Sequence, residues 1–136
     1  MLKGSCLCGT VSYEYAGLLG PIVLCHCRHC RKAQGSAFAT VSPVASDEFR
    51  FVGGRSALKE FELTPGKKRA FCGQCGSPIY SRRDDRPQVL RLRVGTLDTP
   101  VEQKPAFHIF AASKAEWFEI LDGLPQYEAL EPGRGG

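Results

Sequence analysis

The sequence has no long hydrophobic run. The longest nearly unbroken apolar stretch, residues 17–25, is interrupted by a proline. A membrane-spanning helix needs about 20 apolar residues, so no such helix is expected. The first residues also lack the apolar core of a secretory signal. These absences predict a cytoplasmic protein without a membrane segment.

The sequence also lacks internal repeats, low-complexity segments and a large net charge, which is only +4. Basic residues gather in two stretches, residues 25–35 and 63–93, whereas residues 115–136 are acidic. A modest positive region of this kind suits a small anionic ligand. The aromatic residues that interleave with a basic nucleic-acid platform are missing, so nucleic acid is not the expected partner.

Glycine and proline are frequent, with 15 and 9 residues, which favours a turn-rich, mainly β protein over a helical bundle. Residues 10–15 alternate apolar and polar side chains, which predicts a half-buried strand with Val11, Tyr13 and Tyr15 facing inward. Further strands are expected at residues 38–41, 49–52, 57–63, 67–71, 79–82, 88–94 and 107–110. The length of 136 residues predicts one domain, placed at residues 1–130, followed by a flexible tail at residues 131–136.

Two short helices are expected within this mainly β chain. The first covers residues 28–34. The second covers residues 114–121 and would present Trp117, Phe118 and Leu121. Trp117 and Phe118 are expected to pack in the core, and the alternative is that they line the ligand pocket.

Cysteine is the unusual residue of this chain, with seven copies. An odd number cannot pair completely within one chain, and thiols stay reduced in a chain that is not exported. Metal binding therefore explains the cysteines better than disulfide bonds, which remain the alternative.

Two of the cysteine motifs are pairs. Cys72-Gly-Gln-Cys75 has the spacing of a zinc knuckle, which supplies only two ligands. Cys6 and Cys8 lie two residues apart, so in an extended segment both would face one side and could complete a four-sulfur site. Because structural zinc binds with about 10–16 kcal/mol, this site would hold the fold together.

The remaining cysteines, Cys25, Cys27 and Cys30, form a cluster of three. Three protein ligands with one exchangeable position are typical of a catalytic zinc. The alternatives are a site closed by His26 or His29, a partly occupied metal site, and a thiol redox site without metal.

Three stretches resemble one known family. They are Gly4-Ser-Cys-Leu-Cys-Gly9, Cys25-His-Cys-Arg-His-Cys-Arg-Lys32 with Gly35-Ser36, and Phe71-Cys-Gly-Gln-Cys-Gly-Ser-Pro78. These residues resemble the glutathione-dependent formaldehyde-activating enzyme family, which also includes centromere protein V. The similarity runs from about residue 4 to residue 127 and covers all seven cysteines.

The resemblance implies a fold of small antiparallel β-sheets around zinc knuckles, as in the Rab chaperone Mss-four and the methionine-R-sulfoxide reductases. It implies two zinc ions per chain, a structural one and a second one. Their ligand sets would be Cys6, Cys8, Cys72 and Cys75, and Cys25, Cys27 and Cys30. It also implies a carbon–sulfur lyase that joins glutathione and formaldehyde into S-hydroxymethylglutathione, or cleaves that adduct.

Basic residues are the candidates for binding such a substrate. Arg28, Arg31 and Lys32 could offset the negative charge of a zinc held by thiolates, and glutathione carries carboxylates that arginine can clamp. The candidate clamps are Arg82, Arg83, Arg91 and Arg93. Two other functions stay open, namely a non-catalytic zinc module that contacts protein or nucleic acid, and a thiol oxidoreductase.

Overall fold

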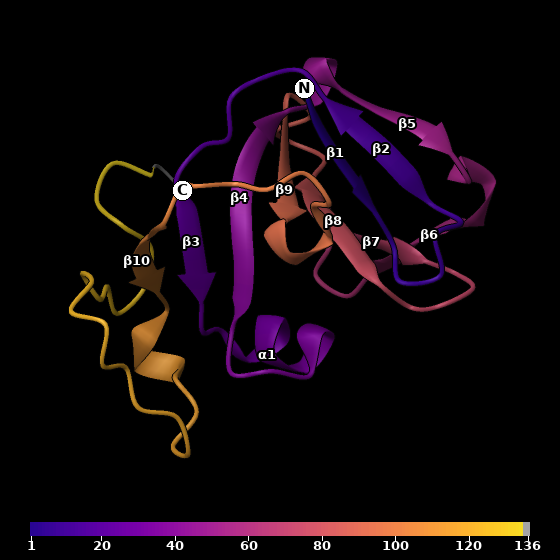
Figure 1. The fold of residues 1–136 in the computed structure, drawn as a ribbon. Helices are drawn as coiled ribbons and strands as arrows, with labels where there is room; N and C mark the ends of the chain where they lie inside the picture. The colour runs from indigo at the N-terminus through magenta and orange to yellow at the C-terminus, as the bar shows by residue number, and fades with distance from the viewer. Residues whose placement is uncertain (135–136) are drawn as a thin grey trace. The chain divides into compact units, whose positions relative to one another are not determined.

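A computed structural model describes residues 1–134 (Figure 1). The chain forms two compact units, and β-strands dominate both. The first unit combines Met1–Gly20 with Ser42–Glu102, and the second combines Pro21–Val41 with the segment that starts at Gln103. The expected mainly β fold of small antiparallel sheets is confirmed, whereas the single domain at residues 1–130 stays a prediction. Among the described residues, no helix has the length and apolar character needed to span a bilayer.

The first unit contains an antiparallel three-stranded sheet in the order β1-β2-β5. Its strands are β1 (Leu2–Ser5), β2 (Ser12–Tyr15) and β5 (Phe49–Gly53). β1 pairs with β2 so that Gly4 lies opposite Tyr13, and the Tyr13 ring covers the space that a side chain at Gly4 would fill. The close approach of the two strands therefore depends on glycine at this position.

Four more strands of this unit pair in the antiparallel order β9-β8-β7-β6. They are β6 (Leu58–Glu62), β7 (Lys67–Cys72), β8 (Pro78–Arg83) and β9 (Val89–Arg93), and short 3-10 turns occur at Ser46–Glu48, Arg55–Ala57 and Val94–Thr96. Before the second of these turns, Gly54 adopts φ +70° and its α-carbon faces the carbonyl of Thr10. Only glycine fits there without strain and collision.

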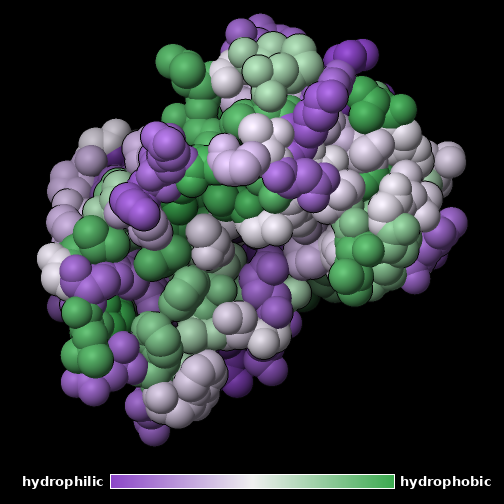
Figure 2. All heavy atoms as spheres, in the orientation of Figure 1, coloured by the Kyte–Doolittle hydropathy of each residue, from purple (hydrophilic) through white to green (hydrophobic). Residues whose placement is uncertain are grey.

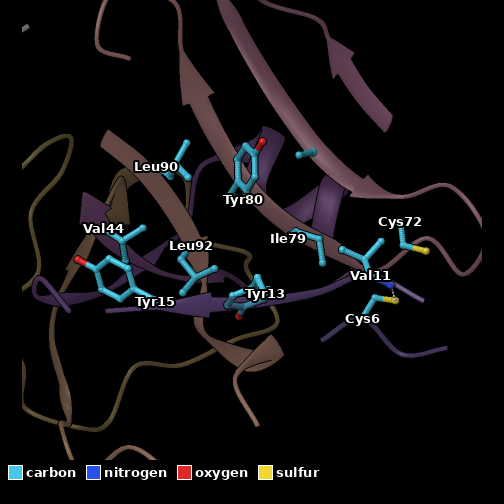
Figure 3. Close-up of a cluster of buried hydrophobic side chains, with 11 residues drawn as sticks. Cys6, Val11, Tyr13, Tyr15, Val44, Cys72, Ile79, Tyr80, Leu90 and Leu92 are labelled. Carbon is cyan, nitrogen blue, oxygen red and sulfur yellow. Dashed lines mark hydrogen bonds between the residues drawn. The ribbon is translucent and has the colours of Figure 1, made fainter. Parts of the chain in front are cut away.

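The core of the first unit confirms the alternation expected at residues 10–15. Val11, Tyr13 and Tyr15 are all buried, and they pack with Ile79 and Leu92 (Figure 3). Each tyrosine hydroxyl has a partner, because Tyr13 Oη lies 2.6 Å from Thr96 Oγ1 and Tyr15 Oη donates to the carbonyl of Leu18. Burial raises the pKa of Tyr13 to about 12. These aromatic side chains therefore join the sheets through apolar packing without leaving unpaired hydroxyls.

The second unit is built on β3 (Ile22–Cys25), which is buried along its whole length. β3 runs parallel to β10 (Pro105–Ile109) and antiparallel to β4 (Ala39–Ala45), which continues into the first unit. The α-helix α1 (Arg28–Gln34) follows β3, as expected. Cys27 caps its start by accepting a hydrogen bond from the Cys30 N–H, and Gly35 ends it in the left-handed conformation.

The helix expected at residues 114–121 is not formed. A 3-10 turn at Ala111–Ser113 is followed by irregular chain. The Lys114 ammonium donates to the carbonyls of Ala115 and Phe118, which therefore have a partner outside any helix. A helix this short gains too few backbone hydrogen bonds to compete.

The side chains of this segment also differ from expectation. Trp117 is 73% exposed and does not enter a core, while Phe118 is half-buried with its ring 5.5 Å from that of Phe38. Leu7, Leu18 and Leu121 are further large apolar side chains that face solvent. Figure 2 shows hydrophobic and hydrophilic residues interspersed on the face in view.

Candidate metal centres

The first unit brings together four cysteines from two distant parts of the chain. Cys6 and Cys8 follow β1, Cys72 ends β7, and Cys75 lies in the turn before β8. Their four sulfur atoms all lie within 4.8 Å of one another. All seven cysteines are free thiols, so these sulfurs are grouped without disulfide bonds.

The sulfur spacing of this group fits a zinc ion. A tetrahedral zinc with Zn–S bonds of about 2.3 Å requires sulfurs about 3.8 Å apart. Cys6 Sγ lies 3.6 Å from Cys8 Sγ, and Cys8 Sγ lies 3.9 Å from Cys72 Sγ. The four cysteines predicted to share one site therefore lie together at a spacing that is compatible with a zinc ion.

Hydrogen-bond donors surround these sulfur atoms. The backbone N–H of Val11 donates to Cys6 Sγ over 3.3 Å (dashed in Figure 3), and that of Gln74 donates to Cys72 Sγ over 3.4 Å. The hydroxyl and backbone N–H of Ser77 lower the pKa of Cys75 to about 5. Donors of this kind favour thiolate, the form of cysteine that binds metal.

The second unit holds the remaining three cysteines as a separate group. Cys25 ends β3, Cys27 caps α1 and Cys30 lies in its first turn, with the three sulfurs within 4.8 Å of one another. The neighbouring thiols of Cys27 and Cys30, followed by burial, raise the pKa of Cys25. Three thiolates this close repel one another, and a bound cation would remove that cost.

Neither nearby histidine belongs to the three-sulfur group among residues 1–134. His29 is exposed on α1. His26 is fully buried and places Nε2 2.8 Å from Nδ1 of His108 on β10. The structure therefore groups three sulfurs here without an imidazole, and the ligand set of this site stays a prediction.

His26 lies in an aromatic setting. Its ring centre is 5.3 Å from that of Phe38 and 6.2 Å from that of Phe118. Burial, aided by the charges of His108, Lys114 and Arg31, lowers the pKa of His26 to about 4. The ring is therefore neutral at neutral pH.

The predicted substrate-binding residues fall into both units. Arg28, Arg31 and Lys32 lie on α1, the helix that carries Cys30; Arg28 and Lys32 are exposed, and Arg31 is half-buried. Arg82 and Arg83 lie on β8 in the first unit. A role of these five residues in binding substrate stays a prediction.

Carboxylates already engage the two arginines of β8. Arg82 pairs with Glu60 and Asp84, and Arg83 pairs with Asp85. The further candidate Arg93 is buried, and its Nη1 donates to the backbone carbonyl of Arg91. A ligand carboxylate would therefore have to displace or join an existing ion pair at Arg82 or Arg83.

Sequence reasoning missed the partners of His26. His108 Nε2 lies 2.8 Å from Asp122 Oδ2, so His26, His108 and Asp122 form one chain of contacts. His26 and His108 are 82 residues apart, and they meet because β3 and β10 pair in parallel. No local spacing in the sequence could signal this arrangement.

Comparison with known proteins identifies relatives of this chain. Residues 1–113 match the model of a family described as glutathione-dependent formaldehyde-activating enzyme. A crystal structure of a Rhodobacter sphaeroides protein is similar, with 26% sequence identity and a TM-score of 0.63. The match covers 74% of this chain and 91% of that one. No curated protein matches the sequence.

Proposed function

Because this chain belongs to the glutathione-dependent formaldehyde-activating enzyme family, we propose that it is a zinc-dependent carbon–sulfur lyase. Its substrates are glutathione, or a similar small thiol, and formaldehyde or another small aldehyde. The reaction forms or cleaves an S-hydroxymethyl adduct. It takes place in the cytoplasm, where small thiols are kept reduced.

One observation carries the proposal: the chain offers a group of four sulfurs and a separate group of three. A structural zinc has four protein ligands, whereas a catalytic zinc keeps a position for water or substrate. The group of Cys6, Cys8, Cys72 and Cys75 fits the first type, and the group of Cys25, Cys27 and Cys30 fits the second. We therefore assign two zinc ions to each chain.

The bond changes of the reaction balance without a further reactant. The thiol sulfur forms a bond to the carbonyl carbon, and the π electron pair of the carbonyl moves to its oxygen. The proton lost by sulfur is the one gained by oxygen, which becomes the hydroxyl of the adduct. A zinc ion at the three-sulfur group would supply Lewis acidity that keeps a bound thiol deprotonated.

Basic residues near the three-sulfur group in the sequence would offset the negative charge of its thiolates. Three thiolates are negatively charged, and a fourth thiol that ionises adds to this charge. Arg28, Arg31 and Lys32 are the nearest cations in the sequence and oppose it. The half-buried Arg31 acts in a medium that screens charge less than water, so it contributes more than exposed Arg28 or Lys32.

Exchange spectroscopy with carbon-13 formaldehyde tests the proposed function. The zinc-loaded protein should accelerate exchange between free formaldehyde and its glutathione adduct beyond the spontaneous rate. Cys27→Ala should lose this acceleration and one of two zinc ions, while Leu7→Ala, an exposed change near the other group, should keep both. No acceleration by the zinc-loaded wild type would refute the proposed activity.

A further inference from the structure

A groove runs along β5 in the first unit. It has a volume of about 560 Å³, and residues 49–55 supply most of its lining. Tyr80 from β8 and Leu90 from β9 line it as well. Neighbouring side chains of a strand point to opposite faces, so a hollow that touches every residue from 49 to 55 follows the backbone edge of the strand.

This edge of β5 has no neighbouring strand among residues 1–134. The sheet has the order β1-β2-β5, so β2 pairs with one edge of β5 and leaves the other at the rim (Figure 1). The open edge of a strand presents a row of N–H and C=O groups that are not used by the sheet. Such an edge can accept one further strand through backbone hydrogen bonds.

The hydrogen bonds on the paired edge show which backbone groups face the groove. Ala16 donates its N–H to the Glu48 carbonyl over 3.0 Å, so the Glu48 carbonyl points toward β2. Backbone groups alternate along an antiparallel strand, so Phe49 and Phe51 direct theirs away from β2. The Phe49 N–H already donates to the Ser46 carbonyl, and the register with β2 shifts just after Phe51. Within residues 1–134, Phe51 is therefore the regular residue of this edge whose N–H and C=O both stay open.

The two ends of β5 carry opposite charges. Asp47 lies in the 3-10 turn before the strand and Arg55 in the turn after it, and both are exposed. Neither joins an ion pair within the described part of the chain. The Arg55 guanidinium lies 5.8 Å from the centre of the Phe51 ring, beside the groove. An antiparallel strand with an acid at its start and a base at its end matches both charges, and β5 itself has this pattern.

We propose that β5 pairs with β5 of a second copy of this chain, antiparallel and across a two-fold axis at Phe51. The Phe51 N–H of each copy donates to the carbonyl of Phe51 of the partner subunit. Asp47 then lies at the strand end that carries Arg55 of the partner subunit, and symmetry repeats this contact at the other end. The two Phe51 rings meet on one face, where the ring centres of Phe49 and Tyr80 lie 5.3 and 6.3 Å from that of Phe51.

Another open edge of the first unit disfavours the same arrangement. β6 is the last strand of its sheet among the residues that the structure describes. In a symmetric antiparallel pair centred on Lys59, Glu60 or Glu62, that residue faces its own copy. Centring the pair on Phe61 places Glu60 opposite Glu62. Like charges face each other in each of these registers, whereas the register centred on Phe51 brings no like charges together.

Sedimentation equilibrium of the zinc-loaded protein tests the pairing. The wild type should form a dimer that dissociates on dilution, because one short strand from each copy makes a small interface. Arg55→Glu should weaken dimerisation by roughly tenfold or more, since it sets two acids against each other at both ends of the pair. Asp47→Arg should do the same with two bases. The double variant should restore the dimer, because it exchanges the charges and keeps their attraction.

Lys59→Glu is the matched control, since it makes the same charge change at an exposed residue of β6 and should leave the dimer unchanged. Amide hydrogen exchange tests the register. The Phe51 N–H should exchange more slowly at concentrations that favour the wild-type dimer than after dilution, and Arg55→Glu should remove most of this difference at the same concentrations.

A wild type that stays monomeric at all concentrations would overturn the inference and leave the groove to a different occupant. A dimer that Lys59→Glu weakens as much as Arg55→Glu, or that the double variant does not restore, would also overturn it. If the single variants fail to fold, the wild-type Phe51 amide decides, because an exchange rate independent of concentration excludes this edge. None of these measurements involves a thiol or an aldehyde, so the lyase proposal stands or fails separately.

Discussion

The sulfur atoms of Cys8 and Cys72 lie 3.9 Å apart although 64 residues separate them. Together with Cys6 and Cys75 they tie the segment after β1 to the β7–β8 turn. A zinc ion at this group would therefore close a long loop of the first unit. The free energy of zinc binding at this group would then contribute directly to the stability of the first unit.

Cys72→Ala should unfold the first unit. Structural zinc contributes about 10–16 kcal/mol, which is as large as the whole stability of a typical domain, about 5–15 kcal/mol. Circular dichroism during heating should show a cooperative transition for the zinc-loaded wild type and none for the variant. Cys27→Ala is the matched control and should keep the transition. Equal loss of structure in both variants would contradict the division into two kinds of site.

Gly54→Ala should destabilise the protein by at least about 2 kcal/mol. Gly54 has φ +70°, and an added methyl group would collide with the carbonyl oxygen of Thr10. Gly95→Ala is the control, because no atom lies near the position of its added carbon and its φ is not positive. Its effect should stay within about 1 kcal/mol in urea unfolding. Equal effects would mean that the Gly54 turn tolerates a side chain.

Glu60→Gln should weaken stability near neutral pH but not in strong acid. The Arg82 guanidinium lowers the pKa of Glu60, so the stabilisation is present above the unfolded-state pKa of about 4.3. It is lost as the pH falls through the lower folded-state pKa. Urea titrations at pH 7 and pH 2 should show a loss of under about 1 kcal/mol at the higher pH only. Glu116→Gln, an exposed control, should show no difference at either pH.

Trp117 should fluoresce as an indole in water. It is the only tryptophan of the chain and is 73% exposed. Its emission maximum should change little on unfolding in urea, and acrylamide should quench it in the native protein. Emission at short wavelength that shifts on unfolding would show that something covers this side chain in solution.

Local patterns predicted much of this structure because they depend on neighbouring residues. The alternation of Val11, Tyr13 and Tyr15 with polar residues predicted the buried face of β2 and of the segment just before it. The short helix expected at residues 28–34 is α1, which begins directly after Cys27. The two sulfur groups could also be predicted, because the number and spacing of the cysteines favoured metal binding over disulfide bonds, and the structure brings the same cysteines together in two groups that could each hold a metal ion.

Other features depend on contacts that a linear pattern does not contain. The spacing of Trp117, Phe118 and Leu121 is typical of a helix, but Lys114 binds the carbonyls of Ala115 and Phe118 and the helix does not form. His26 was considered only as a metal ligand. Its true partner lies on β10, so only the pairing of distant strands reveals it.

The four-sulfur group also has a consequence for biosynthesis. Cys6 and Cys8 leave the ribosome long before Cys72 and Cys75, so the nascent chain has only half of the ligands for most of its translation. Metal capture by the first pair alone would be weak, because two ligands leave the ion half-coordinated. If this group binds zinc as proposed, the first unit can reach its native state only after residue 75 has emerged and the ion has bound.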